Sequence, residues 1–221
     1  IYFCNKLFLM KSKDIGKLRK SYEKKYIDDI NIEKTPFDFF EKWFKDACKD
    51  KLIDEPNAMS LSTISSNGFP RARVVLLKEF GIDGFIFYTN YNSRKGESIK
   101  LNSKVSLSFF WPSLERQILI TGNAFKISDQ KSEKYFNERP LGSRIGAIIS
   151  PQSQIIPNRL FLEKKIKSFS ENNIKRPNYW GGFIVKPSIF EFWQGRPNRL
   201  HDRIEYVLNE NSEWINYRLA P

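Results

Sequence analysis

The feature that most constrains the fold is a series of segments, beginning after Pro56, in which apolar and polar residues alternate with a period of two. Residues 58–65 alternate in this way, and Asn67-Gly68 is a strong hairpin signal before a second strand over residues 71–78. Further strands are predicted over residues 84–89, 105–111, 117–127, 182–186, 188–193, 203–208 and 214–219, with a bulge at Gly122. Many short strands predict a mostly β fold, a largely antiparallel barrel with peripheral helices.

Helical segments are predicted over residues 17–25, 93–101, 128–138 and 158–171, and another helix begins at Thr35. Thr35 is a good N-cap, Pro36 suits a first helical turn, and Asp38 completes a capping-box-like pattern. The apolar residues that follow recur at helical spacing and indicate a core-facing helix: Phe40, Trp43, Phe44, Ala47 and Cys48.

The length of 221 residues fits one domain. We expect it to span residues 17–221, with residues 1–16 as a disordered leader. The leader lacks the basic region and cleavage site of a signal peptide, and no apolar run approaches the roughly 18 residues of a membrane span. Cys4 and Cys48 are the only cysteines, which indicates free thiols in a reducing compartment. We therefore expect a cytoplasmic protein with no membrane partner.

The formal net charge of +12 raises the question of nucleic-acid binding. Lysines outnumber arginines and are spread along the chain, which favours a solvated, Lys-rich surface and no nucleic-acid partner. Metal chemistry is also disfavoured, because His201 is the only histidine and no cluster of Cys and His exists to ligate a metal. The chain has no Gly-x-Ser-x-Gly elbow, no Gly-x-Gly-x-x-Gly fingerprint and no Walker A loop.

Several segments could instead bind a small anion. A strand with Arg73 at one end and Lys78 at the other suits two anionic groups, although a core strand with snorkelling ends explains it equally well. A strand end followed by a helix N-terminus makes a good phosphate site, with an ordinary capped helix as the alternative. That second segment contains Tyr88, Thr89, Ser93, Arg94 and Lys95.

Weaker candidates come from two later segments. Tyr135 and Arg139 lie four residues apart near a helix C-terminus, with Ser143 just beyond, and could share a phosphate. Gln152-Ser153 is a loop with amide and hydroxyl donors, and it is uninformative by itself.

A final candidate lies near the C-terminus. Trp193 precedes the stretch Arg199-Leu200-His201-Asp202-Arg203, and an aromatic ring beside Arg and His could form one wall of a site for a flat heteroaromatic ligand. A structural histidine is the alternative for His201 alone, and the flanking arginines weaken it.

Together these motifs resemble the pyridoxamine 5'-phosphate oxidase family, in its order and at its spacing, over residues 17–221. The resemblance rests on Arg73-x-x-Leu-Leu-Lys78, Tyr88-Thr89-Asn90, Ser93-Arg94-Lys95, Leu114-Glu115-Arg116-Gln117, Glu191-Phe192-Trp193-Gln194-Gly195, Arg199-Leu200-His201-Asp202-Arg203 and Arg218-Leu219-Ala220-Pro221. It implies an FMN-binding split β-barrel that works as a homodimer with each site built from both subunits. It also implies oxidation of pyridoxamine or pyridoxine 5'-phosphate to pyridoxal 5'-phosphate, with O2 reduced to H2O2.

The resemblance further implies roles for individual residues. FMN would contact Arg73, Lys78, Tyr88, Thr89, Ser93, Arg94, Lys95, Gln117, Gln152, Ser153, Trp193 and Arg203. The substrate phosphate would meet Lys78, Tyr135, Arg139 and Ser143, while Arg199 and His201 would act as the catalytic pair that holds the substrate ring. Arg19 and Tyr22 match an N-terminal segment that closes over the substrate, but the family's usual Arg cluster after Tyr22 is replaced by a Lys-rich stretch.

Rival interpretations are a split-barrel flavoprotein of another activity, such as a flavin reductase or a haem-handling relative, and a non-enzymatic binder of pyridoxal 5'-phosphate or nucleic acid. The substrate-side residues Tyr135, Arg139 and Ser143, together with Arg199 and His201, argue against a different flavoprotein activity.

Overall fold

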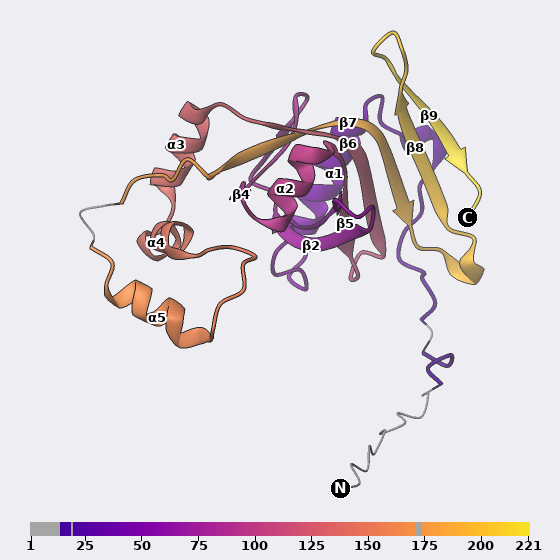
Figure 1. The fold of residues 1–221 in the computed structure, drawn as a ribbon. Helices are drawn as coiled ribbons and strands as arrows, with labels where there is room; N and C mark the ends of the chain where they lie inside the picture. Colours follow the sequence, from indigo (N-terminus) through magenta and orange to yellow (C-terminus); the bar gives the residue numbers. More distant parts are fainter. Residues whose placement is uncertain (1–13, 19, 171–173) are drawn as a thin grey trace, which may run out of the picture.

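The structure is a computed structural model that describes residues 14–18, 20–170 and 174–221, and Figure 1 shows its arrangement. Its strands are β1 (Ala58–Ile64), β2 (Pro70–Leu76), β3 (Glu79–Gly81), β4 (Gly84–Asn90), β5 (Lys104–Trp111), β6 (Arg116–Lys126), β7 (Trp180–Gln194), β8 (Asp202–Leu208) and β9 (Trp214–Leu219). They pair antiparallel in the order β2-β1-β5-β6-β7-β4-β3, and β8 and β9 extend from β7. The prediction of a mostly antiparallel β fold with peripheral helices is confirmed.

The helices are α1 (Pro36–Lys49), α2 (Arg94–Leu101), α3 (Asp129–Glu138), α4 (Leu141–Ile149) and α5 (Arg159–Lys167). Short 3-10 turns cover Asp29–Asn31 and Pro197–Arg199. The sequence did not indicate α4, and the helix predicted over 158–171 ends at Lys167. Within the described parts of the chain, no helix is long and apolar enough to cross a membrane.

The helical character predicted for residues 17–25 is wrong for the residues described there. Residues 20–28 form neither helix nor strand. Their backbone N–H groups donate to side chains from elsewhere in the fold, including Glu115 and Asp202, so an intrahelical ladder does not form. Arg19 lies outside the described residues.

Helix α1 packs an aromatic face on the sheet. Thr35 caps it by accepting the Asp38 N–H at 3.2 Å, as predicted. Phe39 stacks on Phe192 with ring centroids 4.3 Å apart, and Phe40 lies edge-on to Phe109. The predicted stripe is wrong at its end, because Cys48 is exposed, whereas Phe39 is buried. Each fully buried Phe contributes roughly 1.5–3 kcal/mol of transfer free energy to the core.

Strand β7 organises the molecule, because its two halves have different partners. The two strands predicted over 182–186 and 188–193 are one continuous strand that pairs with β6 along its length. Its first half also pairs with β4, and its second half pairs with β8. The register with β6 shifts between Thr121 and Gly122, which confirms the predicted bulge. A Cβ at Gly122 would collide with the Lys186 carbonyl, so glycine lets the strands approach there.

Candidate functional site

A cavity of about 600 Å³ lies where β2 and β4 meet α3, α4 and the loop at residues 150–152. Its size falls within the range of about 300–1,000 Å³ that is usual for small-molecule sites. Eight residues predicted from the sequence line it: Lys78, Tyr88, Thr89, Lys95, Tyr135, Arg139, Ser143 and Gln152. Sequence reasoning missed part of the lining, including Gly146 and Ala147 of α4 and Trp180 at the start of β7. These residues are close to the predicted ones only in the folded chain, so no local sequence pattern indicated them.

Stacked aromatic rings form one wall of this cavity. Tyr88 and Tyr135 stack with centroids 3.9 Å apart, and Trp180 lies parallel to Tyr88 at 5.6 Å. The Arg139 guanidinium lies over the Trp180 ring at 4.6 Å. Burial, with smaller effects of neighbouring groups such as Glu79, raises the pKa of Tyr88 to about 12, so its hydroxyl stays protonated and can donate a hydrogen bond.

Arg73, Lys95 and Arg139 form no salt bridge with a carboxylate in the part of the chain that the structure describes. Burial lowers the pKa of the Lys95 ammonium, and Arg73 lowers it further. Burial and then Arg71 lower the pKa of Arg73, and burial lowers that of Arg139. Among the described residues, neither Arg139 Nη1 nor Arg144 Nε has a hydrogen-bond partner, although both atoms are buried. Partly buried cations without a carboxylate partner are unfavourable, so this arrangement suits an anionic ligand such as a phosphate.

The start of α2 is close-packed around Ser93. Its hydroxyl donates to the Asn90 carbonyl at 2.7 Å and accepts the Gly96 N–H, so it is occupied within the fold. Lys95 Nζ lies 3.2 Å from Thr89 Oγ1, and Thr89 Oγ1 in turn lies 3.4 Å from the Gln152 side chain. These contacts join the end of β4, the first turn of α2 and the loop after α4. The structure thus brings Thr89, Lys95 and Gln152 together, with Ser93 as the cap of the adjacent helix, and their binding of a phosphate stays a prediction.

A second cavity, of about 530 Å³, adjoins the first and shares Gln152 with it. Arg94, Ser153 and Arg71 line this second cavity. Arg73 lies on β2, at one edge of the sheet. Its Nη1 donates to the carbonyl of Leu61 and to Thr63 Oγ1 on the neighbouring strand β1. The structure thus divides most of the predicted FMN contacts of this region between two neighbouring cavities, whereas Arg73 and Ser93 line neither of them.

The remaining predicted residues form a separate group at the other end of β7. Gln117, Trp193 and Arg203 lie opposite one another on β6, β7 and β8. The His201 ring lies 4.6 Å from the Trp193 ring, and Tyr22 lies edge-on to both at 5.9 and 5.6 Å. Three residues predicted to contact FMN, Gln117, Trp193 and Arg203, therefore lie close to His201 and Tyr22, which were predicted to contact the substrate.

The protonation state of His201 follows from its contacts. Its Nδ1 accepts the backbone N–H of Arg196 at 3.0 Å. Burial and then Arg199 lower its pKa below the ordinary value of 6.5, against an opposing effect of Asp202. His201 is thus neutral at pH 7, with Nδ1 as acceptor and Nε2–H as donor. Asn198 and Arg199 both have positive φ, in a tight turn that leaves Arg199 exposed.

The two residues that follow His201 are engaged within the chain. Asp202 accepts the Ile27 N–H and an N–H of Arg218, which gives it a structural role. Arg203 forms a two-point ion pair with Glu191 and donates to the Ala220 carbonyl. The pairing raises the pKa of Arg203, chiefly through the hydrogen bond to Glu191.

The cavity group and the His201 group do not meet within one chain. At about 3.3 Å per residue, the stretch of β7 from Trp180 to Trp193 spans up to about 40 Å. Figure 1 accordingly shows α3, α4 and α5 on one side of the sheet and β8 and β9 on the other. A pocket of ordinary size cannot include both ends of such a strand.

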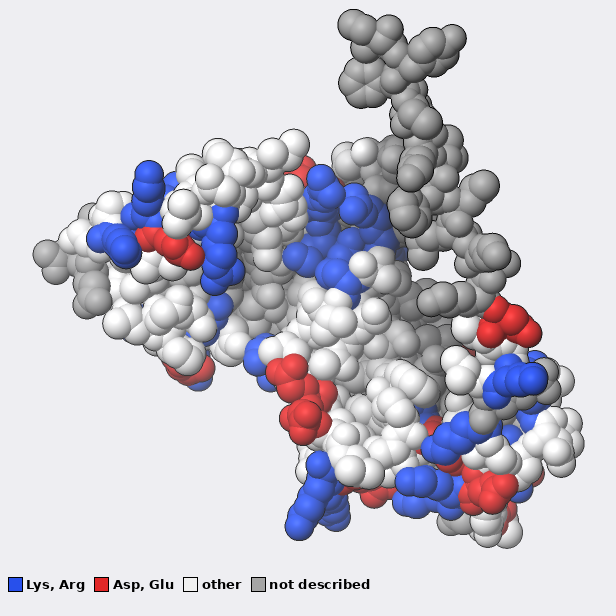
Figure 2. Space-filling model, turned by 90° about the horizontal axis from the view of Figure 1, so that it is seen from below, with Lys and Arg blue, Asp and Glu red and all other residues white. Residues whose placement is uncertain are grey.

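Basic side chains are unevenly distributed on the surface. Figure 2 shows Lys and Arg in several separate groups on one face, one of them near the centre of the view, with Asp and Glu in smaller groups and other residues over most of the surface. The net charge of +12 therefore combines a local cationic group with scattered surface charge.

Comparison with known proteins identifies the family. The family model described as pyridoxamine 5'-phosphate oxidase matches residues 44–173, and the model described as pyridoxine 5'-phosphate oxidase C-terminal dimerisation region matches residues 180–221. The chain belongs to the pyridoxine/pyridoxamine 5'-phosphate oxidase family. Proteins of that name from Flavobacterium psychrophilum and Rippkaea orientalis are 52% and 49% identical to it, over 95% and 94% of this chain and 100% of each relative. The resemblance seen in the sequence motifs is confirmed, and the chain is an enzyme of this oxidase family.

Solved structures agree with the fold. PhzG from Burkholderia lata, in complex with tetrahydrophenazine-1-carboxylic acid, has a TM-score of 0.82 and 25% identity, covering 91% of this chain and 100% of that one. A pyridoxamine 5'-phosphate oxidase-related, FMN-binding protein from Nostoc punctiforme has a TM-score of 0.70 at 16% identity, with coverage of 86% and 100%. The chain thus has the split-barrel fold of FMN-binding proteins.

Proposed function

We propose that the protein oxidises pyridoxamine 5'-phosphate and pyridoxine 5'-phosphate to pyridoxal 5'-phosphate, with FMN as cofactor and O2 reduced to H2O2. For the amine, one water is consumed and one ammonia released, which balances the reaction. The observation that supports this most directly is a cavity of about 600 Å³ lined by Arg139, a partly buried arginine whose buried Nη1 has no hydrogen-bond partner among the described residues, in a chain of this oxidase family. The reaction would be the last step in the formation of pyridoxal 5'-phosphate, and we propose that it takes place in the cytoplasm.

The described residues fit an anionic cofactor, because Lys95 and Arg73 lie close together in a partly buried region. A bound anion would stabilise both cations. Lys95, Arg73 and Arg94 would hold the FMN phosphate, with Thr89, Gln152 and Ser153 as polar contacts. The bound FMN would supply the two-electron acceptor for the oxidation. In a dimer, Gln117 and Trp193 of the second copy would contact it, and Arg203, already paired with Glu191, would hold that contact in place.

Substrate binding would use the opposite part of the cavity. Lys78, Arg139 and the hydroxyls of Tyr135 and Ser143 all line it and offer donors to a phosphate. With its phosphate fixed there, the substrate ring would be held in one orientation, which supplies proximity to the electron acceptor.

Arg199 and His201 would hold the substrate ring on its other side. Neutral His201 has a free Nε2–H, because Nδ1 already accepts from Arg196. It would thus orient a polar group of the substrate by donating a hydrogen bond, and it is not required to act as a base. Arg199, presented on its tight turn, would stack on or hydrogen-bond to the ring.

Such a site requires two subunits, and we propose a homodimer. The cavity group and the His201 group lie at opposite ends of β7, and residues 180–221 match a dimerisation region. Two copies related by a twofold axis can place one end of each β7 against the opposite end of the other. A heterodimer of Arg139→Met and Arg199→Ala subunits would then contain one intact site and recover about half of the wild-type activity. No recovery would show that each site lies within one chain.

The activity itself is tested by colour. Purified protein should show flavin absorption, and pyridoxamine 5'-phosphate should bleach it without oxygen. Readmitting O2 should restore the absorption and yield equal amounts of pyridoxal 5'-phosphate and H2O2. A colourless protein, or a flavoprotein that reduced nicotinamide nucleotides bleach and pyridoxamine 5'-phosphate does not, would refute the proposal.

A further inference from the structure

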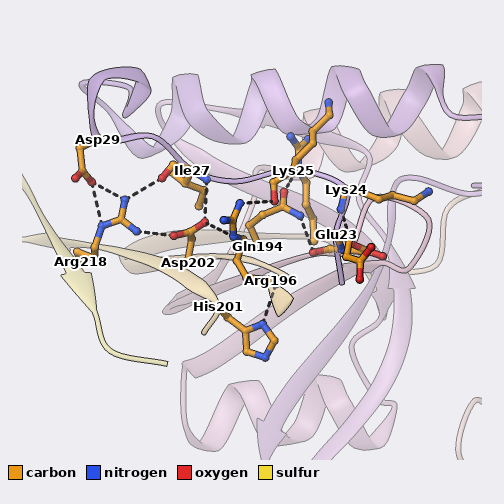
Figure 3. A network of polar contacts seen from close by, with 12 residues as sticks. Glu23, Lys24, Lys25, Ile27, Asp29, Gln194, Arg196, His201, Asp202 and Arg218 are labelled. Carbon is orange, nitrogen blue, oxygen red and sulfur yellow. Dashed lines mark hydrogen bonds and ion pairs between the residues drawn. The ribbon is translucent and has the colours of Figure 1, made fainter. Parts of the chain in front are cut away.

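Residues 20–29 cross the His201 end of the molecule as an extended segment held by side chains. Figure 3 shows the contacts. Glu115 Oε2 accepts the N–H groups of Glu23 and Lys24 at 2.8 and 3.0 Å. Farther along, Ile27 donates its N–H to Asp202 and accepts at its carbonyl from Arg218 at 2.9 Å. The segment is therefore fastened at two points, one on each side of residues 25 and 26.

Glu115 is an unusual residue for the first of these points. Its side chain is only 2% exposed, and its backbone has a positive φ of 56° in the turn before β6. Its carbonyl accepts the Gly195 N–H at 2.7 Å and an N–H of the Gln194 side chain at 3.1 Å. The backbone of Glu115 is thus hydrogen-bonded to the end of β7, next to Trp193. A positive φ is unfavourable for a residue other than glycine, and it persists where the surrounding contacts enforce that conformation.

Glu115 is also ionised. Burial raises its pKa, but the amide N–H groups of Lys24 and Glu23 and the Lys20 ammonium outweigh burial, so the pKa is below its usual value. Lys20 Nζ lies 3.0 Å from Oε1 and is itself largely exposed. Two backbone amides therefore provide much of the local compensation for a buried charge, and a neutral side chain at this position would hold the segment less strongly.

Tyr22 directly precedes the residues that Glu115 binds. Its ring packs against the Gly195 backbone: a Cβ added at Gly195 would lie 2.7 Å from Tyr22 Cγ and 2.8 Å from Tyr22 Cβ. Such distances are closer than van der Waals contact, so any larger residue at position 195 must displace Tyr22. With Gly195 there, the Tyr22 ring lies edge-on to Trp193 and His201.

We infer that Glu115 and Gly195 are positioning residues for Tyr22: Glu115 binds the backbone that follows Tyr22, and Gly195 leaves room for its ring over His201. The inference rests on the proposed function in one respect, because Tyr22 in this place would cover the substrate beside His201. Neither Glu115 nor Gly195 needs to touch the substrate. Both would act on substrate affinity through the placement of one aromatic ring.

The test measures kcat and KM for pyridoxamine 5'-phosphate in the FMN-loaded enzyme. Gly195→Ala and Tyr22→Ala should each raise KM by about 2- to 10-fold, the worth of an aromatic edge contact, with kcat within about twofold. Gly195→Ala should have no further effect in a Tyr22→Ala enzyme. Gly81→Ala is the matched control, since a Cβ at Gly81 meets no atom within 4 Å. If Gly195→Ala raised KM equally with and without Tyr22, the inference would be overturned.

Limited proteolysis tests the contact to Glu115 independently of activity. Trypsin should cleave after Lys24 and Lys25 faster in Glu115→Ala than in the wild type, and Glu115→Gln, which keeps one acceptor oxygen, should lie between them. Glu163→Ala, which removes an exposed carboxylate paired with Arg159, should cleave there at the wild-type rate. Equal cleavage of Glu115→Ala and wild type would refute the role of Glu115, whether or not the enzyme oxidises pyridoxamine 5'-phosphate. If Glu115→Ala does not fold, Glu115→Gln and the Gly195 series decide.

Discussion

Replacing Arg139 with methionine should separate the stability of the protein from its function. In the ligand-free chain, Arg139 is a partly buried cation whose buried Nη1 has no hydrogen-bond partner among the described residues, and burial lowers its pKa. Its favourable contact is the Trp180 ring, 4.6 Å from the guanidinium carbon. Methionine keeps much of the length and the contact with the ring, and it removes the charge and the unpaired donor.

The magnitudes can be compared. Leaving a buried donor unpaired costs about 1–3 kcal/mol, and a cation–π contact returns about 0.5–2 kcal/mol, so Arg139→Met should not lower the free energy of unfolding of the ligand-free protein by more than about 1 kcal/mol. A charged hydrogen bond to a phosphate is worth about 1.5–3 kcal/mol. Its loss should therefore raise KM for pyridoxamine 5'-phosphate by roughly 10- to 150-fold.

Arg176 provides the matched control, because it is an arginine near the same tryptophan with all its contacts made. It donates to Glu133, to Asp129 and to the Trp180 carbonyl. Arg176→Met should leave that carbonyl without its donor and destabilise the protein by about 1–3 kcal/mol, a fall in Tm of about 2–12 °C, with KM unchanged.

The assay is urea unfolding of both ligand-free variants, beside steady-state kinetics with pyridoxamine 5'-phosphate. The reasoning predicts opposite patterns: normal stability and raised KM for Arg139→Met, and reduced stability and normal KM for Arg176→Met. If Arg139→Met were as destabilised as Arg176→Met while its KM stayed at the wild-type value, Arg139 would be a structural cation and the phosphate site would be misplaced.

Three further outcomes are expected. Because the pKa of His201 is lowered in the folded enzyme, kcat/KM and the contribution of His201 to stability should be complete above pH 6.5 and fall at lower pH; a loss that begins above pH 6.5 would contradict this. Lys95→Met should weaken FMN binding to the apoprotein by roughly 10- to 150-fold in a fluorescence titration, while Lys100→Met, exposed on the same helix, should not. Phe39→Ala should lower the free energy of unfolding by about 3–5 kcal/mol in urea, since its ring is 3% exposed and stacked on Phe192.

The strands and most helix starts could be predicted because their signals are local. Asn67-Gly68, Thr35, Ser93 and Ser128 determine a turn and three helix caps through contacts within a few residues. The segment at residues 20–28 could not be predicted in this way. Its hydrogen-bond partners, such as Glu115 and Asp202, are far away in the sequence, so its local helical character was misleading.

The candidate site was predictable in its parts but not in its grouping. Lys95 and Arg139 carry recognisable motifs, and they do line one cavity. The sequence could not show that Arg203 is paired with Glu191, because that pairing depends on the register of neighbouring strands. The sequence also did not indicate Trp180, which contributes to the cavity wall by stacking beside Tyr88.

The separation of the two groups along β7 has a mechanical consequence for the proposed dimer. β7 is hydrogen-bonded to β6 along its length and to β4 or β8 on its other edge, so each half-site is fixed to the same rigid strand. Within one subunit the distance between the half-sites therefore cannot adjust to a ligand. The fit between electron acceptor and substrate would depend on how two rigid subunits meet, which is determined by the interface. Substitutions at that interface, far from either ligand, should then alter kcat by misaligning half-sites that are each intact.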